Sequence, residues 1–261
     1  MTERLDRELV RRGIARSRSQ AHAMISSGRV LVDGSVVARP DDRVTASAAI
    51  DAPVDHYVSR AAHKLIGALD DLQLGVAGRA LDAGASTGGF TQVLLERGCS
   101  EVIAVDVGRG QLAPQLRADP RVRLLERTNL RDLGLGHVGG VPVDLVVADV
   151  SFISLTLLIG QLVAVTRDDG WLLLLVKPQF EVGRELLGKD GVVRTPAHQL
   201  QAISSVIKSA DRYGWHCVVA VPSRLAGASG NREFFVLLRR TESAPNLNLT
   251  ALVEDWQDSG A

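Results

Sequence analysis

The chain has 261 residues, 46% of them hydrophobic, so it can form one large domain or two, each with a buried core. Its 30 basic and 30 acidic side chains balance, so no overall attraction to nucleic acid or to a membrane is expected. The two cysteines, Cys99 and Cys217, lack the spacing of a zinc site or a disulfide framework, which is typical of the reducing cytoplasm. Charges begin at residue 3 and aspartates interrupt the longest apolar stretch, so we expect neither a signal peptide nor a membrane span.

The N-terminal segment differs from the rest of the chain in charge. Residues 1–39 contain eight arginines, four acidic residues and no lysine, a side-chain excess of 8 − 4 = +4. A local excess of this kind suits the phosphate backbone of RNA. A solvated helical face is the alternative that charge alone leaves open.

The same segment has the pattern of a compact module with two helices and a hairpin. Apolar residues recur at helical spacing up to Gly13, which predicts the end of a first helix. Ser17 or Ser19 is a candidate cap for a second helix, which is expected to end at Gly28. An Asp-Gly pair at positions 33–34, flanked by short valine-rich runs, predicts a tight hairpin.

This pattern resembles the small RNA-binding domain named after ribosomal protein S4. The residues that match are Arg4-Leu5-Asp6, Gly13, Ser17-Arg18, Ala21, Ile25, Gly28, Val30, Val32-Asp33-Gly34 and Pro40. The resemblance implies that residues 1–50 form an α+β domain that binds structured RNA, followed by a linker over residues 51–59. It implies RNA contacts from Arg4, Arg11, Arg12, Arg18 and Arg29. The alternative is a helix-hairpin module that serves only for packing.

A glycine-rich turn is the most informative feature of the remaining chain. It covers residues 82–91, between a hydrophobic run and a helical pattern, so a ligand can approach the backbone closely there. It differs from a dinucleotide loop because Ser86 replaces the middle glycine and because Asp82 would repel a pyrophosphate. S-adenosylmethionine, which is cationic and carries no phosphate, fits better. The candidate cofactor contacts in this turn are Asp82, Gly84, Ser86, Thr87, Gly88 and Gly89.

Short apolar runs alternate with helical patterns from residue 79 onward. The expected buried strands are Ala80-Leu81, Val102 to Val105, Val122 to Leu125, Leu145 to Ala148 and Trp171 to Val176. Continuous apolar strands with helices between them predict an α/β, Rossmann-like domain with a mostly parallel central sheet, over residues 60–241. Residues 242–261 are expected to form a tail. Ligands bind at the carboxyl ends of such strands, which places Asp82, Asp106, Asp149 and Lys177 on one rim.

Two polar residues complete the predicted cofactor site. Asp106 lies 106 − 82 = 24 residues after Asp82, and a ribose-binding acid is expected about 20 residues beyond the glycine loop. A helix cap is the alternative role for Asp106. Asn129 follows the third strand and is a candidate contact for an adenine edge, although a plain loop explains it equally well.

Four charged residues carry the chemical hypothesis. Lys177 ends a very apolar strand, which makes it a candidate base, and Asp149 ends the neighbouring strand and can hold it. Lys64 lies on a helix before the first strand of the domain, and Glu233 begins an apolar final strand. Each of them taken alone is an ordinary surface or capping charge. Their placement around one cofactor loop is what points to catalysis.

In this order Lys64, Asp149, Lys177 and Glu233 resemble the Lys-Asp-Lys-Glu tetrad of FtsJ-like ribose 2′-O-methyltransferases. Further matching phrases resemble the TlyA (hemolysin A-like) family. They are Ser59-Arg60, His63-Lys64-Leu65, Asp82 to Thr91, Asp149 to Ser154, Val176 to Glu181 and Ser229-Gly230-Asn231. The resemblance implies an S-adenosylmethionine-dependent enzyme that needs no metal and methylates cytidine 2′-hydroxyls in ribosomal RNA, free or in ribosomal subunits. A ribose hydroxyl is a poor nucleophile, so we expect Lys177 to take its proton or stabilise its oxyanion, with help from Lys64.

The residues alone are also compatible with other functions. Asp149-Val150-Ser151-Phe152 distantly resembles the loop with which base N-methyltransferases grip an amino group, and Phe152 is a candidate for stacking a flipped base. A cytosine carbon methyltransferase needs a thiolate, and neither cysteine is placed for one. A membrane-lytic protein would need a longer apolar segment, and a non-catalytic RNA chaperone would use only the N-terminal module. Residues 183–193 are a candidate lid.

Overall fold

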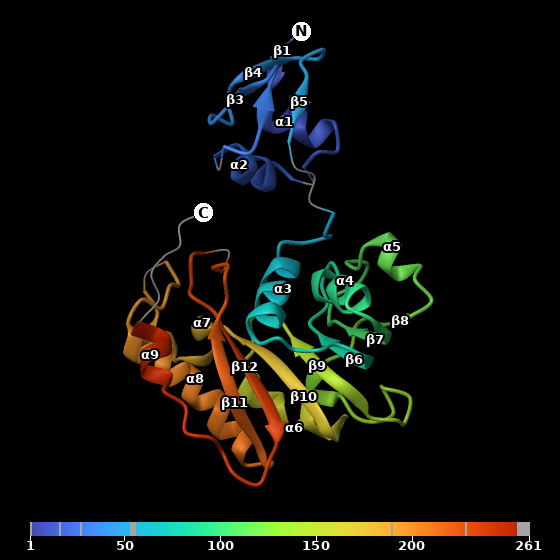
Figure 1. Ribbon diagram of the computed structural model, residues 1–261, viewed down its shortest axis with the longest axis vertical. Helices are drawn as coiled ribbons and strands as arrows, with labels where there is room; N and C mark the ends of the chain where they lie inside the picture. Colours follow the sequence, from blue (N-terminus) through green and yellow to red (C-terminus); the bar gives the residue numbers. More distant parts are fainter. Residues whose placement is uncertain are drawn as a thin grey trace. The chain divides into compact units, whose positions relative to one another are not determined.

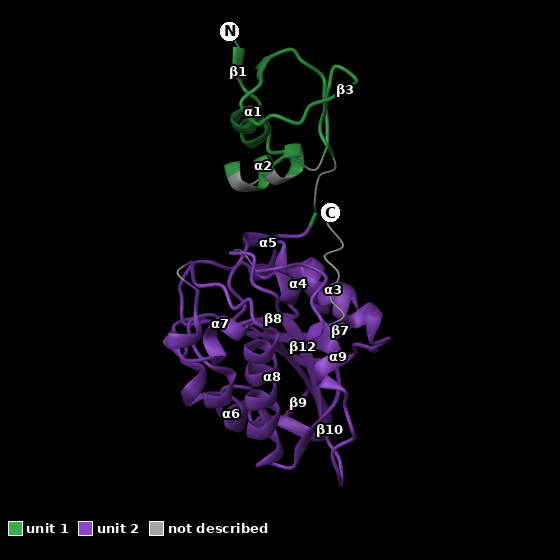
Figure 2. Ribbon diagram, turned by 90° about the vertical axis from the view of Figure 1, so that its left-hand side faces the viewer, with its two compact units in different colours: residues 1–56, 258–261 green, residues 57–257 purple. Residues whose placement is uncertain are grey.

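The protein is described here by a computed structural model that covers residues 2–15, 17–26, 28–52, 56–188, 190–227 and 229–254. The chain separates into two compact units, and the division falls between His56 and Tyr57 (Figure 2). Parts of three predictions lie outside the described residues. These parts are residues 53–55 of the linker, residue 189 of the candidate lid and residues 255–261 of the tail.

The N-terminal unit consists of short strands and two helices (Figure 1). In chain order the elements are β1 (Thr2–Arg4), α1 (Leu5–Arg11), α2 (Arg18–Ser26), β2 (Leu31–Val32), β3 (Ser35–Val36), β4 (Arg43–Thr45) and β5 (Ile50–Asp51). The Oγ of Ser17 accepts a hydrogen bond from the Gln20 amide at 3.2 Å, so Ser17 is the cap of α2. Asp33 and Gly34 have φ angles of 50° and 80°, as the predicted tight hairpin requires.

The larger unit is built on a seven-stranded sheet. Its strands are β6 (Gly78–Ala83), β7 (Cys99–Val105), β8 (Val122–Leu125), β9 (Val143–Ala148), β10 (Thr166–Val176), β11 (Trp215–Pro222) and β12 (Phe234–Arg240). Its α-helices are α3 (Ala61–Asp71), α4 (Gly89–Glu96), α5 (Pro114–Arg117), α6 (Ile159–Ala164), α7 (Pro178–Glu181), α8 (Pro196–Asp211) and α9 (Leu249–Glu254). Short 3-10 helices are η1 (Leu130–Asp132), η2 (Leu155–Leu157) and η3 (Arg184–Leu186).

The strand order of this sheet creates one switch point. The order is β11-β12-β10-β9-β6-β7-β8, with β10, β9, β6, β7 and β8 parallel and β12 antiparallel to β10. From β6 the chain first proceeds to β7 and β8 on one side, and later to β9 and β10 on the other. Ligands of such sheets bind outside the carboxyl ends of the strands where the order reverses, here between β6 and β9. The predicted mostly parallel α/β sheet is confirmed.

Both faces of the sheet are covered by helices, which explains the unbroken apolar runs. Leu172 and Leu174 pack with α6 and α8 on one face, whereas Leu173 and Leu175 pack with α3 and α4 on the other. Successive side chains of a strand point to opposite faces, so every position of β10 from Trp171 onward is buried. Burial of one such leucine contributes about 1.5–3 kcal/mol. Among the helices of the described residues, none combines the length and the apolar character needed to cross a membrane.

Candidate active site

The loop between β6 and α4 forms the floor of the site. Gly84 has a φ angle of 87°, and a Cβ on it would lie 3.0 Å from the backbone oxygen of Asp149. A Cβ on Gly89, the first residue of α4, would collide with the Ser59 hydroxyl and would lie 3.1 Å from the Ala62 amide. Glycine is therefore required at both positions for the loop to lie close to its neighbours.

A cavity of about 160 Å³ opens above this loop at the carboxyl ends of the strands. It is lined by Ser59, Ala61, Gly84, Ala85, Ser86, Thr87, Gly89, Phe90, Asp149, Ser151 and Lys177. The cavity thus brings together Gly84, Ser86, Thr87 and Gly89 of the predicted cofactor loop with two of the predicted catalytic residues. Gly88 caps α4 in a left-handed conformation and does not line the cavity.

Asp106 and Asn129 make local contacts near this loop. Asp106 follows β7, and its carboxylate accepts hydrogen bonds from the Ser86 amide at 2.8 Å and the Gly108 amide at 2.7 Å. It therefore holds the glycine loop and stays partly exposed. The side chain of Asn129 caps η1 by accepting from the Arg131 amide at 3.0 Å, so it has the plain loop role that the sequence left open.

Asp82 requires a correction. The sequence placed it in the turn, but it lies inside β6 with a fully buried side chain that does not line the cavity. One carboxylate oxygen accepts from the Thr91 hydroxyl at 2.6 Å, and the other, Oδ1, has no hydrogen-bond partner. Burial, with a smaller contribution from the Asp149 charge, raises the pKa of Asp82 to about 7. The strand extends to Ala83 because the sheet continues pairing there, which local composition does not reveal.

Lys177 follows β10 and lies at the edge of the cavity. Its ammonium nitrogen donates to the Ser151 hydroxyl at 2.9 Å and lies 2.6 Å from Oδ1 of Asp149. The contact with Asp149 has the distance of an ion pair without the angles of a hydrogen bond. Lys177 is 9% exposed, so two neighbours from one loop fix its position beside the cavity.

Lys64 and Glu233 form a second, more deeply buried pair. The Lys64 ammonium donates to Oε2 of Glu233 at 2.5 Å, and the two residues are 6% and 3% exposed. Lys64 lies on α3 and Glu233 directly precedes β12, so the contact joins residues 169 positions apart. Neither residue lines the cavity.

Strand register brings the two pairs next to one another. Val176 of β10 is paired with Phe234 of β12, so Lys177 and Glu233 lie one position beyond the last pair of the ladder. Leu175 and Phe235, the pair before it, point to the face covered by α3. Because side chains alternate along a strand, Lys177 and Glu233 are directed toward that same face, where Glu233 meets Lys64 of α3.

Three residues outside the predicted catalytic and cofactor sets lie in or near the site. Ser151 holds Lys177 and lines the cavity, and its signal was its position two residues after Asp149. Ser59 lines the cavity from the segment before α3, and its signal was the matching phrase Ser59-Arg60, to which no role was assigned. Phe152 is 91% exposed with a φ angle of 65°, and its ring lies 5.2 Å from that of Phe180. An exposed aromatic ring on an unusual backbone is a surface for stacking rather than for the core.

Neither cysteine lies in an environment that would activate its thiol. Cys99 and Cys217 are buried, and burial raises the pKa of each thiol to about 12. Thiols of this kind are unreactive, so the reading as a cytosine carbon methyltransferase has no nucleophile here. In the described part of the chain, no group of three or more His, Cys, Asp or Glu side chains is arranged to hold a metal ion.

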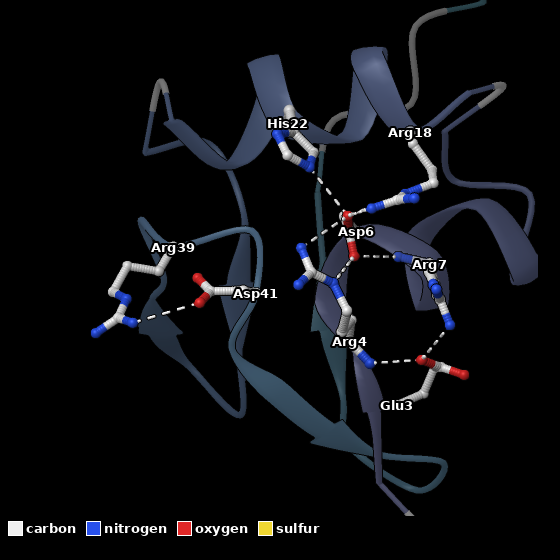
Figure 3. A network of polar contacts seen from close by, with 8 residues as sticks. All are labelled: Glu3, Arg4, Asp6, Arg7, Arg18, His22, Arg39 and Asp41. Atoms are coloured by element: carbon white, nitrogen blue, oxygen red, sulfur yellow. Dashed lines mark hydrogen bonds and ion pairs between the residues drawn. The ribbon is translucent and has the colours of Figure 1, made fainter.

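The arginines of the N-terminal unit gather around two buried acids. Asp6 accepts from Nε of Arg4 at 3.0 Å, from Nη2 of Arg18 at 2.8 Å, and lies 2.9 Å from Nε2 of His22 (Figure 3). These contacts, that from Arg4 first, hold the pKa of Asp6 well below its usual range although burial opposes them. Arg18 remains 55% exposed, so its guanidinium is fixed in place and still accessible.

Glu8 forms ion pairs with Arg11 and Arg12, two further arginines that were predicted to contact RNA. Arg11 contacts Glu8 at 2.5 Å and is 60% exposed, whereas Arg12 contacts it at 2.7 Å and also donates to the Ala48 carbonyl at 2.7 Å. Hydrogen bonds led by that from Arg11 lower the pKa of Glu8 to about 2. Arg12 therefore makes more contacts within the domain than Arg11 does, and an RNA contact from either residue stays a prediction. Arg29 is exposed.

Comparisons with known proteins agree with this geometry. The sequence model described as FtsJ-like methyltransferase matches residues 57–240, and the model described as S4 domain matches residues 3–50. The chain belongs to the FtsJ-like methyltransferases. The match to the S4 domain model confirms the N-terminal domain that the sequence predicted.

Its relatives include proteins with two kinds of names. The 16S/23S rRNA (cytidine-2′-O)-methyltransferase TlyA of Mycobacterium tuberculosis is 51% identical over 90% of this chain and 89% of its own length. Hemolysin A of Brachyspira hyodysenteriae is 34% identical over 88% of this chain and 97% of its own. A solved structure of a candidate hemolysin from Streptococcus thermophilus has a TM-score of 0.76, at 35% identity, and covers 97% of this chain and 94% of that one. The chain is thus similar to TlyA proteins over nearly its whole length.

Proposed function

We propose that this methyltransferase transfers a methyl group from S-adenosylmethionine to the ribose 2′-hydroxyl of a cytidine in ribosomal RNA. The observation that carries the proposal is the held position of Lys177 at the cavity, with the Lys64–Glu233 pair beside it. The names of its relatives support the nucleotide and the RNA class, and the S4 domain supports binding to RNA. Ribosomal RNA or a ribosomal subunit as the substrate implies that the enzyme acts in the cytoplasm.

The residues of the cavity fit S-adenosylmethionine. The glycine loop lets a ligand approach the backbone, and Asp149 places a carboxylate where a cationic ligand is favoured. The buried Oδ1 of Asp82 has no hydrogen-bond partner, so it can still accept a hydrogen bond. Asp106, partly exposed beside Ser86, can accept hydrogen bonds from ribose hydroxyls. When bound, the cofactor supplies an electrophilic methyl group.

The side chains of the site then act on the ribose hydroxyl. Nζ of Lys177 is the group we assign to the ribose hydroxyl. As the ammonium it stabilises the oxygen as that oxygen loses its proton, and only as the neutral amine can it take the proton itself. Ser151 and Asp149 restrict the ammonium to one position, so little motion is needed before transfer. Lys64, paired with Glu233, adds a second cationic group on the same face of the sheet, which favours negative charge on the oxygen.

Replacement of Lys177 tests the proposal. Lys177→Ala is expected to lower methyl transfer to ribosomal RNA by about 100-fold or more, because the proton-handling group is lost. Affinity for S-adenosylmethionine is expected to stay nearly unchanged. The measurement is transfer of labelled methyl to ribosomal subunits, followed by nuclease digestion. Lys208→Ala, an exposed lysine on α8, is the matched control, and retained turnover in Lys177→Ala would refute the assigned role.

The digestion also separates the rival functions. The exposed ring of Phe152, the residue after the cavity-lining Ser151, is the observation that favours a base N-methyltransferase. Label on a nucleobase would support that rival, and label on ribose supports the present proposal. The hemolysin names of some relatives raise lysis as a further activity, which a cell-lysis assay with purified protein tests directly.

A further inference from the structure

A partly buried carboxylate next to the site has no part in the mechanism above. Glu181 ends α7, four residues after Lys177. Its Oε2 accepts from the Ser154 hydroxyl at 2.6 Å, and its Oε1 accepts from the Leu155 amide at 2.8 Å. Burial raises the pKa of Glu181, while these two donors oppose that shift. Both carboxylate oxygens are thus committed to one short segment.

That segment is the loop that holds Lys177. It runs from Asp149 to Leu155, and its first half carries Asp149 and Ser151, the two partners of the Lys177 ammonium. Its second half carries the two donors to Glu181. Lys177 and Glu181 lie one helical turn apart. They therefore bind opposite ends of the same loop.

The middle of the loop needs such anchoring. Phe152, with its φ angle of 65°, has a backbone conformation that a bulky residue rarely adopts, and its side chain is 91% exposed. Its own burial therefore does little to hold this conformation. A strained backbone conformation persists only where contacts with the surrounding structure fix it. The contacts of Lys177 and Glu181 lie on either side of Phe152 in the loop.

We propose that Glu181 is a positioning residue for methyl transfer, which anchors the loop so that Ser151 and Asp149 hold Lys177 at the cavity. This inference rests on the proposed function, because Lys177 is assigned there to the ribose hydroxyl. Glu181 itself does not line the cavity, so it acts through the loop.

The chemistry of the anchor predicts which substitutions preserve it. Glu181→Ala removes both contacts. In Glu181→Gln the amide oxygen can still accept from the Leu155 amide, and the amide nitrogen can donate to the Ser154 hydroxyl. That hydroxyl lies 2.6 Å from Oγ1 of Thr156, so its proton has another acceptor. The glutamine variant is therefore the conservative replacement, and the alanine variant is the disruptive one.

The test compares these variants in the full-length protein by the ribose-methylation assay. Glu181→Ala is expected to lower kcat by about 10- to 100-fold, the range for residues that orient functional groups. The KM for RNA and the dissociation constant for S-adenosylmethionine should stay unchanged, and Glu181→Gln should restore most of kcat. Glu242→Ala, at an exposed glutamate two positions after β12, is the matched control.

A double variant separates positioning from general stability. If Glu181 acts through Ser151, Glu181→Ala costs little further activity in a Ser151→Ala background, because both changes release the same lysine. Amide hydrogen exchange adds a readout independent of turnover, and Glu181→Ala should speed exchange at residues 149–155 with other strands protected.

Three results would overturn the inference. They are wild-type kcat in Glu181→Ala, additive losses in the double variant, or unchanged exchange in the loop. Failure of the proposed function looks different, since the wild-type enzyme itself would then place no label on ribose. In that case the exchange experiment would still decide whether Glu181 anchors the loop.

Discussion

At the scale of single residues, Asp82 shows how position in the sheet sets chemistry. Burial raises the pKa of this carboxyl from 3.8 to about 7. Between these values the folded protein keeps a proton that the unfolded chain has released. The free energy of unfolding therefore decreases as the pH rises through this window, and the cost is fully present above it.

Asp82→Asn is expected to remove this dependence. An amide never ionises, and its oxygen can still accept from the Thr91 hydroxyl, as the carboxylate does. Thermal unfolding is measured at pH 5 and pH 8 without cofactor. The Tm of the variant minus the Tm of the wild type should be larger at pH 8 than at pH 5. Parallel curves for the two proteins would contradict the assignment, and Asp132→Asn, an exposed aspartate, serves as control.

At the scale of elements, β10 is the centre of the larger unit. It pairs with β9 on one side and β12 on the other, and its leucines are buried on both faces. Its carboxyl end delivers Lys177, and the turn that follows delivers Glu181. The same packing that stabilises the fold thus fixes where Lys177 lies.

Leu173→Ala is expected to lower the free energy of unfolding by about 2–5 kcal/mol, because it leaves a cavity in a well-packed core. Leu157→Ala removes a side chain that is 53% exposed and should change stability by less than about 0.5 kcal/mol. Urea denaturation measures both. Equal effects of the two substitutions would show that the burial of β10 does not dominate stability.

The whole molecule has a net charge of zero, but its two compact units differ in the side chains that they present. The first carries arginines that buried acids hold in place, while the second carries the cavity. In the proposed function these two units have different tasks: phosphate contacts from the first would supply affinity for RNA, and the cavity of the second would supply the chemistry.

Replacement of Arg11 and Arg18 by alanine should weaken binding of a ribosomal RNA fragment and leave affinity for S-adenosylmethionine unchanged. Each lost phosphate contact is expected to reduce the slope of log affinity against log salt by about one. Arg12 and Arg4 still pair with Glu8 and Asp6, so the domain should keep its fold. Fluorescence anisotropy at several salt concentrations measures the slope, and an unchanged slope would exclude these arginines as contacts.

Local patterns in the chain were sufficient to predict the elements of the fold and the types of residue at the site. Apolar runs, the glycine loop and the hairpin are local patterns, and local patterns predict strands, helices and turns. They also placed Asp149 and Lys177 at strand ends. Only the tertiary structure decided which charges meet. Lys64 and Glu233 lie 169 positions apart, and their contact depends on strand order and register. The burial of Asp82, the contact of Arg12 with the Ala48 carbonyl and the contacts of Glu181 with residues 154 and 155 have the same cause. The partners of side chains are set by long-range packing, which no local pattern records.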